Sequence, residues 1–129
     1  MARRQADAEL RRKTVLVVDD EDDVLEIVSE MISQLGYRVK AASSGEAAQL
    51  VMSKTPVDLV ICDLKMRGID GFSLAKWVRG HFPHLPLAMM TAFPTDDVKK
   101  AVKQKLVDSL LTKPFQLNEL QHMVQSLAR

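Results

Sequence analysis

The sequence has few of the features that mark disulfide-bonded, membrane or nucleic-acid-binding proteins. It has one cysteine, Cys62, and a formal net charge of +1 over 129 residues. One cysteine excludes an internal disulfide and is typical of a reducing compartment, and a nearly neutral chain is unlike a nucleic-acid-binding domain. No apolar run is long enough to span a bilayer, and the charged first residues do not fit a signal peptide. We therefore expect a cytoplasmic protein whose partners include neither membranes nor nucleic acid.

What the sequence does have is the composition of one globular domain. Hydrophobic residues make up 47% of the chain and charged residues 27%. A chain of 129 residues can bury a core without disulfides or metal ions. Residues 1–13 differ from the rest, because five of them are basic and two are acidic. We interpret residues 1–13 as a flexible basic leader or linker, and residues 14–129 as the domain.

Short apolar segments alternate with amphipathic ones along the domain. Strands are predicted at 14–20, 37–42, 57–63, 85–91 and 108–112, where the runs are short and mostly apolar. Helices are predicted at 22–35, 46–54, 72–80, 96–106 and 116–128. Ser43 and Glu46 have the spacing of a capping box before the second of these helices. Five strand–helix units predict an α/β fold, a doubly wound parallel sheet with helices on both faces.

Charged and hydroxyl side chains stand at the carboxyl ends of the predicted strands. Asp19 and Asp20 end the first strand, Asp63 the third, Thr91 the fourth, and Lys113 follows the fifth. Ligands of such sheets bind at this edge. Three carboxylates gathered there would repel one another unless a cation lay between them, and an all-oxygen acidic site suits Mg²⁺.

A lysine and a hydroxyl beside such carboxylates suit a phosphoryl group. An aspartate next to Mg²⁺ and lysine can act as the nucleophile that accepts phosphate. The chain has no glycine-rich phosphate loop, so nothing predicts that it holds a nucleotide. Taken singly, each residue also has an ordinary explanation: acids can cap a helix, a threonine can end a strand, and a lysine can be solvated.

Four motifs in order resemble one known family. "VLVVDDE" (15–21), "DLVICDLKMRGIDG" (58–71), "MMTA" (89–92) and "LLTKPF" (110–115) are similar to the receiver domain of two-component response regulators. The resemblance covers residues 14–128 without an obvious insertion. It implies a flavodoxin-like sheet of five parallel strands in the order 2-1-3-4-5.

The resemblance also implies the metal site. Asp63 matches the phosphoacceptor, and Asp20 matches the acid that binds Mg²⁺ directly. Asp19 matches a neighbour that acts through water. Lys65 matches the residue whose backbone carbonyl binds the metal.

The remaining site residues and the partners follow from the same resemblance. Thr91 matches the hydroxyl that moves to contact the phosphoryl group, and Lys113 matches the lysine that contacts it, with a cis peptide expected before Pro114. The implied phosphodonor is a sensor histidine kinase or a phosphotransfer protein, and the downstream partner is unknown. Such a domain switches conformation on phosphorylation and catalyses its own aspartyl phosphorylation and dephosphorylation, at the border of being an enzyme.

The sequence departs from the family pattern in three places. Arg67 stands where proline is usual, and Leu110 stands where an aromatic switch residue is usual. In 96–106, lysines take positions that are usually apolar, which predicts a shifted, shorter or mobile fourth helix.

These departures keep other functions open. Arg67 and Leu110 fit a receiver-like protein-binding module that does not switch by phosphorylation. A metal-dependent phosphohydrolase is a third class, but Lys65 stands where such enzymes commonly have a second acid. Because the chain ends with the predicted last helix, we expect no output segment in it. It fits a free-standing receiver or one cut from a longer protein.

Overall fold

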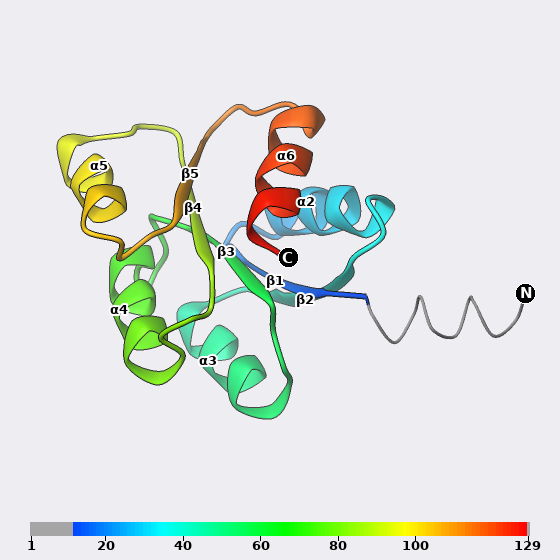
Figure 1. Cartoon of the computed structure of the whole chain (residues 1–129), viewed down its shortest axis with the longest axis horizontal. Coiled ribbons are helices and arrows are strands. Elements are labelled where there is room, and N and C mark those ends of the chain that lie inside the picture. The colour runs from blue at the N-terminus through cyan, green and yellow to red at the C-terminus, as the bar shows by residue number, and fades with distance from the viewer. Residues whose placement is uncertain (1–11, 129) are drawn as a thin grey trace, which may run out of the picture.

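The computed structural model describes residues 12–128, which form one parallel sheet between two layers of helices (Figure 1). The strands are β1 (Thr14–Val18), β2 (Arg38–Ala42), β3 (Leu59–Asp63), β4 (Leu87–Thr91) and β5 (Ser109–Thr112). They pair in the order β2-β1-β3-β4-β5. This confirms the predicted doubly wound fold and its strand order. Residues 1–11 of the predicted leader lie outside the described part of the chain, so the leader stays a prediction.

The helices are α2 (Asp22–Gln34), α3 (Gly45–Lys54), α4 (Gly71–His81), α5 (Asp96–Lys103) and α6 (Leu117–Leu127). Helices α2 and α6 pack on one face of the sheet, and α3, α4 and α5 on the other. No helix within residues 12–128 is both long enough and apolar enough to cross a membrane.

Strands β1, β3 and β4 are buried on both faces, which explains their continuous apolar runs. Met89 and Met90 illustrate the alternation, because consecutive side chains of a strand point to opposite faces. Both are fully buried, Met89 in the core under α3, α4 and α5 and Met90 in the core under α2 and α6. The strands that carry Asp19, Asp63 and Thr91 are therefore packed on both faces.

Two predicted helix features need correction or refinement. The cap of α3 is Ser44 rather than Ser43: the Ser44 side chain accepts a hydrogen bond from the Ala47 N–H, with Oγ and N 3.0 Å apart. Helix α5 ends at Lys103, three residues before the predicted end at 106. That this helix is shifted, shorter or mobile relative to the family's fourth helix stays a prediction.

Candidate functional site

The predicted site residues do lie together at the carboxyl edge of the sheet. Asp63 is the last residue of β3 and Thr91 the last of β4, while Asp19 and Lys113 directly follow β1 and β5. The parallel register sets their level, since Val18 pairs with Cys62 and Thr91 with Thr112. Apolar strands thus carry charged groups to one edge, as the alternation of strands and helices predicted.

Lys113 joins two of the carboxylates. Its Nζ lies 2.9 Å from Asp63 Oδ1 and 3.4 Å from Asp19 Oδ2. The peptide from Lys113 to Pro114 is cis, as expected. A single ammonium group therefore faces both the predicted phosphoacceptor and its buried neighbour.

Three carboxylates converge beside this lysine. One oxygen each of Asp19, Asp20 and Asp63 lies within 4.8 Å of the others. The Asp19 side chain is fully buried, and Asp63 is 9% exposed. Hard oxygen ligands that repel one another in the absence of a cation fit Mg²⁺. The chemistry of these ligands therefore suits the predicted metal, with Asp20 at the solvent side.

Burial raises the pKa of Asp19 above its ordinary value, and the charge of Asp63 raises it further. The hydrogen bond from the Glu21 N–H and the charge of Lys113 oppose this rise. Burial lowers the pKa of Lys113, but its hydrogen bond to Asp63 and the charges of Asp19 and Asp63 outweigh burial, so this pKa is raised. Lys113 is therefore cationic at neutral pH.

Thr91 is buried, and its hydroxyl bonds to the backbone of Phe93. Its Oγ1 donates to the Phe93 carbonyl at 3.3 Å and accepts from the Phe93 N–H at 3.2 Å. Phe93 itself is 70% exposed, at the start of the loop that leads to α5. The predicted contact between Thr91 and a phosphoryl group would require the hydroxyl to give up the bond that it donates to the Phe93 carbonyl.

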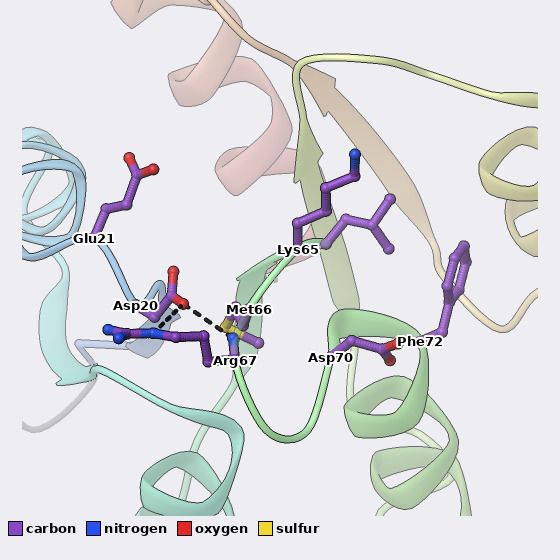
Figure 2. Close-up of a pocket in the computed structure, with 8 residues that line it drawn as sticks. Asp20, Glu21, Lys65, Met66, Arg67, Asp70 and Phe72 are labelled. Carbon is purple, nitrogen blue, oxygen red and sulfur yellow. Dashed lines mark hydrogen bonds and ion pairs between the residues drawn. The ribbon is translucent and has the colours of Figure 1, made fainter.

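A hollow of about 750 Å³ opens beside the carboxylates (Figure 2). It is lined by Asp20, Glu21, Leu64, Lys65, Met66, Arg67, Asp70 and Phe72. The Lys65 side chain points away from Asp20 in Figure 2, and its Nζ lies 6.0 Å from the centre of the Phe93 ring. The pocket could admit a ligand or a partner's side chain next to Asp20.

Two contacts of the loop between β3 and α4 were not predicted from the sequence. The Arg67 N–H donates to Asp20 Oδ2 at 3.0 Å, although the Arg67 side chain is 92% exposed. Glu46 accepts a hydrogen bond from the Ile69 N–H at 3.2 Å. Its position near the start of α3 had suggested only a capping role, and no sequence signal connects it to a loop more than twenty residues away.

The fold and the site together define a class of protein: a doubly wound α/β domain with carboxylates, a lysine and a threonine at the carboxyl edge of its sheet. The model of the response regulator receiver domain family matches residues 15–125, and the chain belongs to this family.

Curated relatives include two proteins of Pseudomonas aeruginosa. The transcriptional regulatory protein GltR is 30% identical over 120 residues, which cover 91% of this chain and 49% of GltR. The response regulator protein FleR is 36% identical over 111 residues, which cover 85% of this chain and 23% of FleR. The chain thus spans half or less of the length of these relatives.

Solved structures of similar length agree with the fold. The chemotaxis protein CheY4 of Vibrio cholerae is 29% identical with a TM-score of 0.85, and the match covers 90% of this chain and 98% of that one. The response regulator protein TrrA of Thermotoga maritima, solved in complex with Mg(2+)-BeF, is 30% identical with a TM-score of 0.81 over 89% of this chain and 98% of that one.

Proposed function

We propose that this domain takes a phosphoryl group onto Asp63 from the phosphohistidine of a sensor histidine kinase or a phosphotransfer protein. The observation that supports this proposal most strongly is the arrangement at Asp63. Its Oδ1 lies 2.9 Å from Lys113 Nζ, and Asp19 and Asp20 converge beside it. Membership in the response regulator receiver family supports the same reading. The proposal also includes the identity of the phosphodonor, the existence of a downstream protein partner, and a cytoplasmic location.

The chemical step is a displacement at phosphorus. A carboxylate oxygen of Asp63 attacks, a P–O bond forms, and the P–N bond to the donor imidazole breaks, with the electron pair leaving on the imidazole nitrogen. Lys113 places a fixed positive charge at the acceptor carboxylate. Positioning and charge neutralisation supply most of the acceleration in such transfers.

Magnesium would be held by Asp20, Asp63 and the Lys65 carbonyl, with Asp19 acting through water, and would supply positive charge to the phosphoryl oxygens. The buried Asp19 side chain positions Lys113 beside Asp63, with Asp19 Oδ2 and Lys113 Nζ 3.4 Å apart.

The switch would run through Thr91. A phosphoryl oxygen on Asp63 would compete with the Phe93 carbonyl as the acceptor of the Thr91 hydroxyl proton. Because Phe93 is exposed and begins the loop before α5, losing the bond to its carbonyl would change the surface that a downstream partner meets. Leu110, at the usual aromatic position, makes this readout depend on the loop more than on a ring.

The test is phosphotransfer from a panel of autophosphorylated histidine kinases from the same cell. We expect rapid transfer from at least one kinase to the wild-type chain and none to Asp63→Asn. Asp70→Asn is the matched control, since Asp70 lines the same pocket and caps α4, and asparagine preserves a cap. Undiminished labelling of Asp63→Asn would contradict the assignment.

A binding module that does not switch by phosphorylation is the second candidate, favoured by Arg67 and Leu110. Absence of transfer from every kinase, and from small phosphodonors, would select it.

A further inference from the structure

Arg67 contacts Asp20 in two ways, from the loop between β3 and α4 (Figure 2). Its N–H donates to Asp20 Oδ2 at 3.0 Å. Its guanidinium Nε lies 3.6 Å from the same oxygen. A carboxylate that converges with Asp19 and Asp63 is therefore also paired with a cation at the rim of the site.

The charges of the site divide into two groups. Lys113 pairs with Asp19 and Asp63, at the buried end. Arg67 pairs with Asp20, whose side chain is 18% exposed. The carboxylates are thus partly neutralised before any metal arrives, and a divalent cation entering at Asp20 meets the Arg67 charge at short range.

The two cations differ in how easily they can leave. The Lys113 side chain is 23% exposed and bonded at 2.9 Å. The Arg67 side chain is 92% exposed, and exposed ion pairs of this kind are weak and screened by salt. The guanidinium can therefore swing into water.

The loop itself does not need to move with the side chain. Gly68 turns the loop with a φ of +77°, a conformation that glycine adopts without strain. Glu46 holds the next residue by accepting the Ile69 N–H. Loss of the guanidinium contact leaves these anchors in place.

We propose that Arg67 is a displaceable counter-ion of Asp20 that sets the magnesium affinity of the site. Without magnesium the guanidinium pairs with Asp20; magnesium binding exchanges one cation for the other. Arg67 thereby raises the magnesium concentration that the domain needs before it can accept a phosphoryl group. This inference rests on the proposed function, because it assumes that the carboxylates bind Mg²⁺.

The experiment is a magnesium titration of the full chain without any phosphodonor, followed by calorimetry and by amide chemical shifts. We expect Arg67→Gln to bind Mg²⁺ about threefold to tenfold more tightly than wild type. Arg67→Lys keeps the charge and should stay closer to wild type. Lys99→Gln, which removes an exposed charge on α5 outside this pocket, should leave the affinity nearly unchanged.

Two further measurements separate this role from a structural one. The affinity ratio of Arg67→Gln to wild type should fall toward one at about 1 M salt, because the ion pair is then screened. The magnesium-free free energy of unfolding of Arg67→Gln should fall by no more than the free energy that corresponds to its gain in magnesium affinity, because both come from the same ion pair. A larger loss of stability would indicate a structural role for Arg67.

Equal or weaker magnesium binding by Arg67→Gln, with saturable binding by wild type, would overturn the role of Arg67 and leave the proposed function standing. Equal gains in Arg67→Gln and Lys99→Gln would also overturn it, because the effect would be one of net charge. Absence of saturable binding in every protein would overturn the metal site, and this inference with it.

Discussion

At the scale of single residues, strand-end positions predicted the carboxylates and the lysine that meet in the structure. Asp19, Asp63 and Lys113 come together because the parallel strands that precede them end at one edge of the sheet. The alternation of strands and helices in the sequence predicts such a parallel sheet. The contact of Arg67 with Asp20 could not be predicted, because it depends on the path of a loop. Glu46, which is distant in sequence, bonds to this loop at the Ile69 N–H.

Asp19 carries the clearest pH dependence. Burial raises its pKa in the folded state, so between the ordinary pKa of 3.8 and the raised value the folded protein binds more protons than the unfolded one. Its contribution to the free energy of unfolding therefore falls as pH rises through that window, and at neutral pH the buried charge costs stability.

We predict that Asp19→Asn raises the free energy of unfolding at pH 7 in the absence of Mg²⁺ by about 1 kcal/mol, a typical size for a single substitution. The asparagine can still accept the Glu21 N–H. Urea unfolding at several pH values measures the gain, which should shrink as pH falls through the raised pKa of Asp19 toward 3.8. A loss of stability at pH 7, or a gain that does not depend on pH, would contradict the prediction.

At the scale of elements, helix positions followed from apolar periodicity, but ends did not. The serines at 43 and 44 both have cap chemistry, and only the backbone geometry decides between them. Ser44 is extended, with φ −157° and ψ 162°, and its side chain caps α3. Helix α5 ends at Lys103 rather than at the predicted 106, and only Val98 and Ala101 of this helix are buried.

The cap of α3 gives a prediction with a neighbouring control. Ser44→Ala should lower the free energy of unfolding by about 1 kcal/mol, because it removes the acceptor of the Ala47 N–H. Ser43→Ala, at an exposed position one residue earlier, should change it by less than about 0.5 kcal/mol. Urea unfolding of both variants checks this, and equal losses would reject Ser44 as the cap.

Helix α4 offers a second matched pair. A Cβ on Gly71 would lie 2.7 Å from the Asp63 carbonyl oxygen and 2.8 Å from Leu64 Cα, both backbone atoms. Gly71→Ala should therefore destabilise the protein by about 2 kcal/mol or more and displace the loop next to the phosphoacceptor.

Gly80 lies in the same helix with no atom within 4 Å of an added Cβ. Gly80→Ala should stabilise by about 0.5–1 kcal/mol, since alanine favours a helix. Thermal unfolding compares the pair; a Gly71→Ala protein as stable as wild type would show that the close approach of α4 to β3 is not required.

At the scale of the whole molecule, the alternation of strands and helices predicted a parallel sheet covered on both faces. It could not give the strand order, because β1 pairs with both β2 and β3 and such pairing is not local in sequence. The strand order was predicted from the resemblance of four motifs to a family, and the sheet in the structure has this order.

The packing of the whole domain holds the carboxyl edge of the sheet in place. Two helices on one face and three on the other bury β1, β3 and β4, so Asp63 stands at the end of a rigid strand. Exposed groups lie at the rim of the site: the Arg67 side chain and Phe93, which begins the loop before α5. We therefore expect the chemistry at the buried strand ends and the regulation at this exposed rim.

Phosphorylation of Asp63 is tested most directly by incubating the chain with a small acyl phosphate and Mg²⁺, and measuring its intact mass and the position of the added group. We expect one phosphoryl group, on Asp63, that is absent from Asp63→Asn and from samples with excess chelator. No mass increase in the wild-type protein, or a phosphoryl group that persists in Asp63→Asn, would contradict it.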